Sequence, residues 1–302
     1  MSARDPILRE DLSTAMTARL GKAGGFVFDM DGTLVLGDRR NRGLKPLPGS
    51  IELTTYLHEQ GVPFVVVTNG TTRTPAGYAE VMRSLGFPVG EGDLLTPVSA
   101  ALELFEQQRH RRVMVLGGDG LTQPLLTAGF EVVPPVKDSG ADAVLVGWYR
   151  EVTFADLEAA CDAVWAGARF YSSSQSMFFA TAEGRVLGTS RAISAVVRDL
   201  TGAHIEVVGK PSVHTLSAAA RRVGVSTEEL AVVGDDPELE MAMAHQGGSL
   251  AVSVSTGVRS HASFTTLPPH QSPDIGFSGV DELYAVYRHR RPSSGEEPDE
   301  GQ

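Results

Sequence analysis

The sequence predicts an α/β fold, a doubly wound parallel-sheet (Rossmann-like) core into which a second α/β unit is inserted. The first observation behind this prediction is that short apolar runs alternate with helix-length amphipathic segments, a pattern typical of a parallel sheet covered on both faces. The second is that polar residues directly follow several apolar runs, where ligands of parallel sheets bind. A long middle stretch lacks such endings, which indicates the inserted unit.

Six short apolar runs are the predicted strands. In chain order they lie at residues 25–30, 63–69, 112–118, 141–148, 230–236 and 249–255. The runs that end near 29, 68 and 235 stop at acidic or hydroxyl residues, whereas the two runs within 97–189 do not. The polar chemistry therefore belongs to one sheet and not to the other.

Five amphipathic segments are the predicted helices, and each of them ends in glycine, a common C-terminal stop. They lie at residues 49–61, 74–86, 153–167, 190–202 and 212–224.

The length of 302 residues allows two domains, or one core that carries an insertion. We divide the chain into an N-terminal extension, the first part of the core, an inserted α/β cap, the second part of the core and an acidic tail that is predicted to be disordered. The bounds of these parts are 1–20, 21–96, 97–189, 190–290 and 291–302.

Composition excludes several classes of function. A formal net charge of -11 argues against nucleic acid as a partner, and it means that an anionic substrate needs local cations in its site. Cys161 is the single cysteine, so neither a disulfide nor a cysteine-built metal site is expected, and its helical context predicts a buried thiol. This fits a reducing, cytoplasmic compartment. No apolar run approaches the roughly 20 residues that span a bilayer, so no membrane partner is expected.

The first polar loop is "DMDGT", in which Asp29 and Asp31 follow an apolar run. Residues two apart in an extended chain project to the same side, so the two carboxylates face one small volume. Their repulsion falls when a divalent cation binds, because Mg²⁺ takes carboxylate oxygens as ligands. The alternative for this loop is an ordinary turn or helix-capping pair.

The second and third loops offer groups that bind phosphate. Thr68 and Asn69 in "VVVTNG" supply a hydroxyl, an amide and backbone N–H groups for phosphoryl oxygens, with turn formation as the alternative. Lys210 lies between Gly209 and Pro211 in "VGKPS", a constrained turn in which an ammonium can neutralise charge on a phosphoryl group. The alternative for Lys210 is a solvated side chain.

The fourth loop is "LAVVGDDPELE", where Asp235 and Asp236 follow an apolar run. They supply further oxygen ligands for a cation. The alternative is that they cap the next helix, whose Pro237 suits a first helical position.

Together the four loops, in the order D-x-D-G-T, T-N, G-K-P and G-D-D, resemble the motifs of the haloacid dehalogenase-like hydrolase superfamily. The resemblance spans residues 25–287 and is closest to the subclass IIA branch, in which a large α/β cap follows the second loop. NagD-like enzymes, 4-nitrophenylphosphatases and phosphoglycolate phosphatases belong to that branch. The stretches "VMVLGGDGL" and "ADAVLVGWYREVTFADLEAA" and the "STGV" near Gly257 are part of the resemblance.

The resemblance implies a Mg²⁺-dependent phosphatase that hydrolyses a small phosphomonoester, such as a sugar, glycerol, glycolate or nucleotide phosphate, through an aspartyl-phosphate. Asp29 would be the nucleophile that attacks phosphorus. Asp31 would protonate the leaving alcohol and later deprotonate the hydrolytic water. The implied catalytic residues are Asp29, Asp31, Thr68 and Lys210.

The resemblance also implies how the cofactor and substrate are held. Mg²⁺ would bind the Asp29 carboxylate, the Asp31 backbone carbonyl and Asp235, with waters completing its shell. Asp236 and Glu240 would lie behind these ligands. The implied partner is a small phosphorylated metabolite, and a homodimer through the cap is a further expectation. The phosphoryl oxygens would be held by Thr68, Asn69, Gly70 and Lys210.

The sequence departs from the family pattern in three places. Glu240 is a longer carboxylate at a position where the family often has a second acid. The second loop reads "TNGTT" instead of "TNNST", so Gly70 lacks a side chain for which Thr71 or Thr72 is the candidate replacement. The cap reads "YSSSQSMFFA" where relatives often show "ATNPD", which indicates another substrate, and residues 177–179 of that stretch are predicted to be core.

Two other functions stay open on the sequence. One is a phospho-accepting receiver domain, which also uses strand-end aspartates, a threonine and a lysine near Mg²⁺. The long insertion and a general acid at Asp31 favour the phosphatase over this signalling class. The other is a binding protein of the same fold that has lost catalysis, which the departures at Glu240 and in the second loop would fit.

Overall fold

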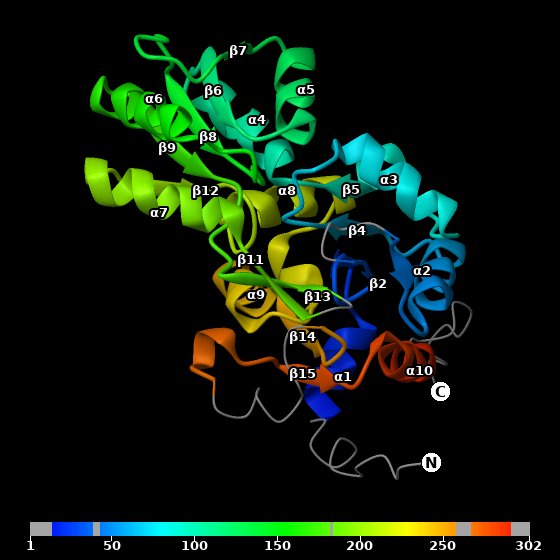
Figure 1. Ribbon diagram of the computed structural model, residues 1–302. Coiled ribbons are helices and arrows are strands. Elements are labelled where there is room, and N and C mark those ends of the chain that lie inside the picture. The colour runs from blue at the N-terminus through cyan, green and yellow to red at the C-terminus, as the bar shows by residue number, and fades with distance from the viewer. Residues whose placement is uncertain (1–13, 39–42, 182–183, 258–266, 291–302) are drawn as a thin grey trace, which may run out of the picture.

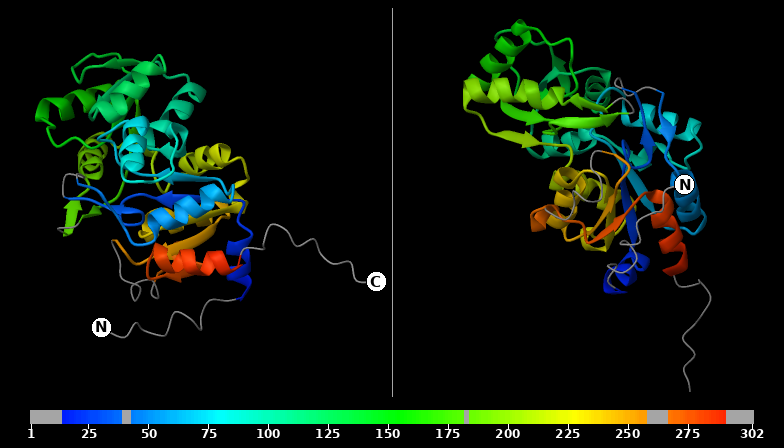
Figure 2. Two further views of the ribbon diagram at one scale, coloured as in Figure 1. Left: turned by 90° about the vertical axis from the view of Figure 1, so that its right-hand side faces the viewer. Right: turned by 60° about the horizontal axis from the view of Figure 1, so that its bottom comes forward.

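A computed structural model describes residues 14–38, 43–181, 184–257 and 267–290. It contains two α/β units, each built on its own sheet, and Figure 1 shows them stacked one above the other. The two further views of Figure 2 show the same arrangement. The predicted α/β fold with a mainly parallel sheet is confirmed.

The core sheet has six strands in the order β15-β14-β13-β1-β4-β5. All neighbouring strands in it are parallel, with Phe26 of β1 opposite Ala231 on one side and Phe64 on the other. The carboxyl ends of its strands therefore meet at one edge. The strands are β1 (Gly25–Asp29), β4 (Phe64–Val67), β5 (Leu94–Leu95), β13 (Leu230–Gly234), β14 (Leu250–Val254) and β15 (Ile275–Phe277).

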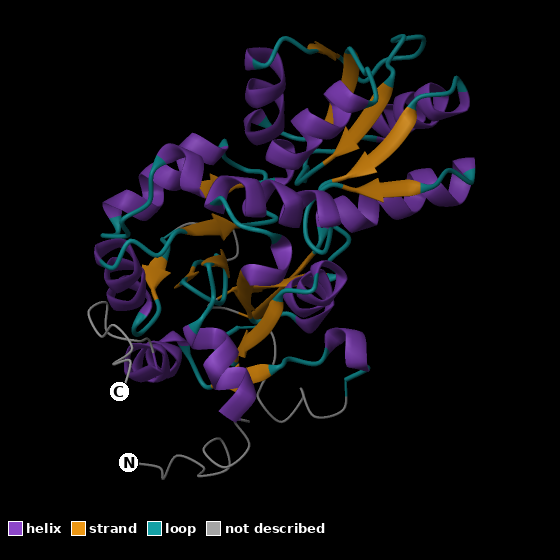
Figure 3. Cartoon of the chain, turned by 180° about the vertical axis from the view of Figure 1, so that it is seen from behind, coloured by secondary structure: helices purple, strands orange, loops and turns teal. Residues whose placement is uncertain are grey.

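Helices cover both faces of the core sheet, as Figure 3 shows in purple and orange. Alternate side chains of β1 enter opposite cores, because Phe26 and Phe28 pack on one face and Val27 on the other. The first face is covered by α1 (Thr14–Gly21), α2 (Ser50–Glu59), α3 (Pro75–Ser84) and α10 (Val280–Arg290). The second is covered by α8 (Val213–Val223) and α9 (Ala242–Gly247).

The inserted unit has a five-stranded parallel sheet in the order β12-β9-β8-β6-β7. Its strands are β6 (Arg112–Leu116), β7 (Glu131–Val133), β8 (Ala143–Val146), β9 (Arg169–Ser172) and β12 (Ile205–Val207). The helices α4 (Pro97–Gln107) and α5 (Asp119–Thr127) pack on one face, and α6 (Phe154–Trp165) and α7 (Thr189–Thr201) on the other. Cys161 is buried in the second of these cores, as predicted.

The insertion extends beyond the predicted boundary at residue 189. Helix α7 packs on its sheet, and β12 pairs in parallel with β9 from Ile205 opposite Phe170 to Val207 opposite Ser172. The apolar runs of the sequence do not reveal β12, because this strand is short and its residues are only half buried.

Smaller elements complete the chain. Two antiparallel hairpins pair β2 (Val35–Leu36) with β3 (Lys45–Pro46), and β10 (Phe178–Thr181) with β11 (Gly184–Leu187). Short helical turns lie at η2 (Glu91–Asp93), η3 (Thr227–Glu229) and η6 (Pro269–Gln271), and a π-helical turn, η4, lies at Pro237–Met241.

The two predicted terminal segments differ in what the structure describes. Part of the N-terminal extension forms α1, in which Leu20 is fully buried and Arg19 donates a hydrogen bond to the Gly248 carbonyl. The predicted acidic tail, 291–302, lies outside the described residues. Within the described ranges, no helix has the length and apolar character that crossing a membrane requires.

Candidate active site

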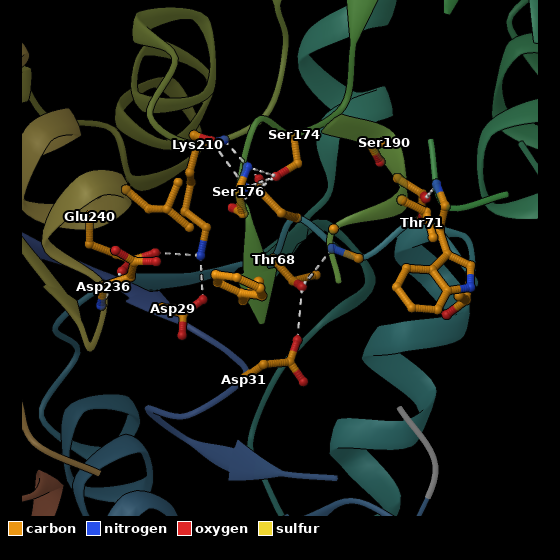
Figure 4. Close-up of a pocket in the computed structure, with 18 of the residues that line it drawn as sticks. Asp29, Asp31, Thr68, Thr71, Ser174, Ser176, Ser190, Lys210, Asp236 and Glu240 are labelled. Carbon is orange, nitrogen blue, oxygen red and sulfur yellow. Dashed lines mark hydrogen bonds and ion pairs between the residues drawn. The ribbon is translucent and has the colours of Figure 1, made fainter. Parts of the chain in front are cut away.

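A pocket lies between the carboxyl ends of the core strands and the insertion, and Figure 4 shows the side chains around it. Residues that are far apart in the chain meet there because the core strands are parallel and the insertion covers their ends. The pocket is lined by every predicted site residue: Asp29, Asp31, Thr68, Asn69, Gly70, Lys210, Asp235, Asp236 and Glu240.

The first loop turns sharply after β1. Strand β1 ends at Asp29, and Gly32 has a φ of 96°, a left-handed conformation that favours glycine. Its N–H donates to the Val35 carbonyl at 2.8 Å, which closes the turn. A Cβ at Gly32 would also lie 2.8 Å from Asp235 Oδ2, so glycine is needed for the close approach of that carboxylate.

Lys210 is buried, with 2% of its side chain exposed. Its ammonium donates to Asp29 Oδ1, to Glu240 Oε1 at 2.8 Å and to the Val67 carbonyl at 3.2 Å. Burial alone would lower the pKa of Lys210, but the two carboxylates hold that pKa well above its ordinary value. Lys210 is therefore a permanent buried cation, and the alternative of a solvated lysine is wrong.

The nucleophile candidate, Asp29, has one carboxylate oxygen in use and one free. Oδ1 accepts from Lys210, whereas Oδ2 is buried and has no hydrogen-bond partner among the described residues. A buried anionic oxygen without a partner is costly unless a ligand satisfies it. Asp29 Oδ2 is therefore an oxygen to which a cation or a phosphorus atom can bind.

The donor set near Asp29 fits a hard divalent cation. Asp235 is buried, and its carboxylate is packed so closely on Gly257 that a Cβ there would overlap Oδ2. Among the described residues, no three His, Cys, Asp or Glu side chains form a metal cage by themselves. The predicted site does not need three such side chains, because it combines two carboxylates with a backbone carbonyl and waters, as Mg²⁺ sites commonly do.

Asp31 has the electrostatics of a general acid. It accepts a hydrogen bond from Thr68 Oγ1 at 3.2 Å, a contact that Figure 4 draws. Burial and the neighbouring charge of Asp29 raise the pKa of Asp31 to about 7, although Lys210 and Thr68 act in the opposite direction. The carboxyl group can therefore both give and take a proton near neutral pH.

Asn69 is turned away from the role that the sequence suggests for its side chain. Its Nδ2 donates to the Lys210 carbonyl at 3.0 Å and to Ser174 Oγ at 3.2 Å, and its Oδ1 accepts from the Lys210 N–H at 2.8 Å. The amide is thus bonded to two other loops and not directed at a phosphoryl group.

The glycine in the second loop has a local explanation. A Cβ at Gly70 would overlap the hydroxyl oxygen of Tyr78, which is itself buried. Thr72 Oγ1 lies 2.9 Å from that hydroxyl, and Thr71 Oγ1 accepts from the Trp148 N–H of the insertion at 2.8 Å. Neither threonine hydroxyl replaces the missing side chain, since both are bonded elsewhere.

The fourth loop divides its acidic residues between two tasks. Asp236 caps η4 and accepts from the Glu238 N–H at 2.9 Å, so the capping alternative holds for this residue. Glu240 accepts from the Asp236 N–H at 3.0 Å and pairs directly with Lys210. The absence of a side chain at Gly234 leaves room for Glu240, because a Cβ at Gly234 would overlap the Glu240 side chain.

The insertion contributes residues that the sequence did not assign to the site. Ser174 and Ser176, from the serine-rich stretch, line the pocket together with Trp148. Phe178 lines it as well, and Met177 and Phe178 are 46% and 40% exposed, so the prediction that these two residues are core is wrong. The side chain of Phe179, the third residue of that prediction, lies outside what the structure describes. Met177 and Phe178 directly follow the serine run that departs from the family pattern, and this departure is the sequence signal that could have indicated their place at the pocket.

Family models match two separate parts of the chain. A haloacid dehalogenase-like hydrolase model matches residues 26–131, which include the first two loops. A second, HAD-hydrolase-like model matches residues 207–283, which include the third and fourth loops. The unmatched residues between them lie in the insertion.

Known proteins are similar over most of the chain. The acid sugar phosphatase of Staphylococcus epidermidis is 28% identical over 250 residues, 82% of this chain and 93% of the relative. The solved p-nitrophenyl phosphatase of Archaeoglobus fulgidus is 27% identical with a TM-score of 0.76, over 88% of this chain and 99% of the other. A glycerol phosphate phosphatase from Mycobacterium tuberculosis, solved in complex with magnesium, shares the fold at 24% identity and a TM-score of 0.76, over 88% of this chain and 77% of the other.

Proposed function

The chain belongs to the haloacid dehalogenase-like hydrolases and is a phosphatase, and on this premise we propose that it hydrolyses small phosphomonoesters through an aspartyl-phosphate on Asp29. The observation that carries the proposal is the state of the Asp29 carboxylate. One oxygen is held by the buried cation of Lys210, and the other faces no hydrogen-bond donor of the described chain. That second oxygen is free to attack.

The proposed first step transfers the phosphoryl group to Asp29. Asp29 Oδ2 attacks phosphorus, the bond to the leaving oxygen breaks, and Asp31 gives its proton to that oxygen. A pKa near 7 suits this task, because a group that is half protonated at the working pH can act in both directions. In the second step Asp31 takes a proton from the attacking water, and the acyl phosphate is hydrolysed.

Charge on the phosphoryl oxygens would be offset by Lys210 and by the Thr68 hydroxyl. Lys210 is buried and held by other groups before substrate arrives, so it needs little reorganisation during the reaction. The Thr68 hydroxyl donates its one hydrogen to Asp31, so it has to turn from Asp31 to donate to a phosphoryl oxygen. The backbone N–H of Asn69 is a further candidate for this contact, whereas the Gly70 N–H, which the sequence also suggests, donates to Thr68 Oγ1 at 2.9 Å.

We propose that Mg²⁺ is the cofactor. The Asp29 and Asp235 carboxylates and the Asp31 carbonyl would hold it, and it would supply charge neutralisation between the carboxylates and the anionic substrate. The Asp29 and Asp235 carboxylates line one pocket, where a bound cation lowers their mutual repulsion, and this supports the proposal. The magnesium of the Mycobacterium tuberculosis complex belongs to that protein.

The substrate is proposed to be a small phosphorylated metabolite. The relatives are named for sugar, aryl and glycerol phosphates, which share only the phosphomonoester. The insertion closes the pocket with residues that differ from the family pattern, so the leaving group is where this chain would differ from its relatives. The homodimer through the cap stays a prediction.

The test is substitution of the nucleophile. Asp29→Asn keeps the size of the side chain and removes its charge, and it should abolish turnover of p-nitrophenyl phosphate at saturating Mg²⁺. Asp199→Asn, an exposed aspartate on α7, is the matched control and should keep full activity. Undiminished turnover by the Asp29 variant would refute the mechanism. Repeated rapid turnover by the unsubstituted protein would also separate it from a receiver domain, which keeps its phosphoryl group.

A further inference from the structure

The side chain of Asn69 is paired with the backbone of Lys210. Its amide nitrogen donates to the Lys210 carbonyl at 3.0 Å, and its amide oxygen accepts from the Lys210 N–H at 2.8 Å. Lys210 comes shortly after β12, the last strand of the insertion, at the point where the chain returns to the core. Asn69 thus connects the loop that follows β4 of the core to the segment in which the chain leaves the insertion.

The remaining N–H of the Asn69 amide is bonded to the insertion. It donates to Ser174 Oγ at 3.2 Å. An asparagine amide has two N–H donors, so Lys210 and Ser174 together use both of them. The Asn69 side chain therefore has no donor left for a substrate while these contacts last.

Ser174 belongs to a hydrogen-bonded loop, residues 172–176, which we call the serine loop. Ser174 Oγ donates to Ser176 Oγ at 3.0 Å and accepts from the Ser176 N–H at 3.1 Å, in addition to the bond from Asn69. A hydroxyl has one donor and two acceptor sites, so all three are used. Figure 4 shows Ser174 and Ser176 beside Lys210.

The three loops touch at Gly209. A Cβ at this position would overlap both the Ser173 carbonyl and Asn69 Oδ1. Only glycine lets the backbone before Lys210 approach both loops this closely. Displacement of the serine loop would therefore shift Asn69 and the Lys210 backbone.

We propose that Asn69 is a positioning residue that links the serine loop of the insertion to Lys210. This inference rests on the proposed function. The Asn69 amide fixes the Lys210 backbone so that the ammonium stays on Asp29, and its bond to Ser174 makes that position depend on the serine loop. Contact between the serine loop and a leaving group then changes the position of the Lys210 ammonium at the phosphoryl site, although the leaving group does not touch Lys210.

The first test is a double-substitution cycle with two substrates, p-nitrophenyl phosphate and glycerol phosphate. Asn69→Ala should lower kcat about tenfold for both substrates, because it removes two hydrogen bonds from Lys210. Ser174→Ala should lower kcat about threefold for both, with little change in KM. The double variant should be no slower than Asn69→Ala alone, since Ser174 acts through Asn69.

The control is Ser84→Ala, an exposed serine at the end of α3, which should leave kcat and KM unchanged. Two results would overturn the proposal. One is a product of the two single effects in the double variant, which would mean that the residues act independently. The other is an effect of Ser174→Ala on the KM of glycerol phosphate alone, which would mean direct contact with the leaving group.

A second measurement does not depend on turnover. Inorganic phosphate has no leaving group, so its binding excludes any contribution from a contact between Ser174 and a leaving group. Calorimetric titration of phosphate at saturating Mg²⁺ should show binding about threefold weaker in Ser174→Ala, and the double variant should bind no more weakly than Asn69→Ala. If the protein turns over no phosphomonoester, the proposed function fails while this titration still decides the inference. Unchanged phosphate affinity in Asn69→Ala would overturn it.

Discussion

Lys210 and Glu240 form an ion pair from which solvent is almost excluded. The Lys210 Nζ lies 2.8 Å from Glu240 Oε1, and the two side chains are 2% and 1% exposed. The same ammonium contacts Asp29, so it is shared between the nucleophile candidate and a second acid. Glu240 therefore helps to decide how strongly Lys210 holds Asp29.

Glu240→Gln should impair both stability and turnover. Glu240 accepts from the Asp236 N–H with one oxygen and from Lys210 with the other, and a glutamine has only one oxygen for these two donors. Breaking a buried ion pair from one side costs about 3–5 kcal/mol of unfolding free energy. We expect a lower melting temperature and a kcat reduced at least about tenfold.

The matched control for this prediction is Glu238→Gln, since Glu238 is exposed on the same helical turn. It should differ little from the unsubstituted protein in thermal melts and in steady-state kinetics. Wild-type stability of the Glu240 variant would mean that the pair contributes nothing.

The raised pKa of Asp31 predicts how rate depends on pH. Asp31 has to be protonated to donate to the leaving oxygen, and with a pKa of about 7 it loses that proton as the pH rises through neutrality. The kcat for an alkyl phosphate should therefore fall above about pH 7. The kcat for p-nitrophenyl phosphate should fall less, because nitrophenolate leaves without a proton. Parallel pH profiles for the two substrates would argue against Asp31 as the acid.

The same pKa predicts how stability depends on pH. Burial and Asp29 raise the pKa of Asp31 from its ordinary value of 3.8 to about 7, so between these values the folded protein binds more protons than the unfolded chain. The contribution of Asp31 to stability is then fully present below its unfolded pKa and is lost as the pH rises through the folded one. At higher pH the charged form of Asp31 therefore lowers the unfolding free energy.

Asp31→Asn removes that charge and should stabilise the metal-free protein. In the presence of a chelator at about pH 8, the gain in unfolding free energy should be roughly 2–4 kcal/mol. At about pH 4 the gain should be close to zero, because the wild-type carboxyl is then protonated in the folded protein. Thermal melts at the two pH values measure this difference. An equal gain at both would show that the effect is not one of charge.

The gathering of the site residues could be predicted from the sequence, because it follows from parallel strands. Asp29, Thr68 and Asp235 each end an apolar run, and the carboxyl ends of such runs meet at one edge of a sheet. Lys210 needed more than this rule, since it follows a strand of the other sheet. Its glycine-proline context and the family resemblance indicated it, and the structure places it in the same pocket.

The partners within the site could not be predicted. The bonds of Asn69 to Lys210 and of Thr71 to Trp148 join distant segments, and in the sequence these residues are compatible with ordinary turns. The direct contact of Glu240 with Lys210 depends on a π-helical turn, which the sequence pattern of a regular helix does not reveal. Such contacts depend on tertiary packing, so they follow from the fold and not from local pattern.

The hydrogen bond between Thr71 and Trp148 leads to the last prediction, because it joins the second core loop to the insertion. Thr71 is buried, and its hydroxyl accepts the Trp148 N–H at 2.8 Å. Thr71→Val keeps the shape and removes the hydroxyl oxygen that accepts from that N–H, which should cost about 1–3 kcal/mol. Trp148 lines the pocket, so a loosened contact at this residue should raise KM several-fold. The effect on kcat should be smaller, because Asp29 ends β1 of the core sheet and the contacts of Asn69 with Lys210 are unchanged. The control is Thr122→Val on α5, outside the pocket lining. Equal KM values in the two variants would show that this contact does not hold the insertion over the substrate.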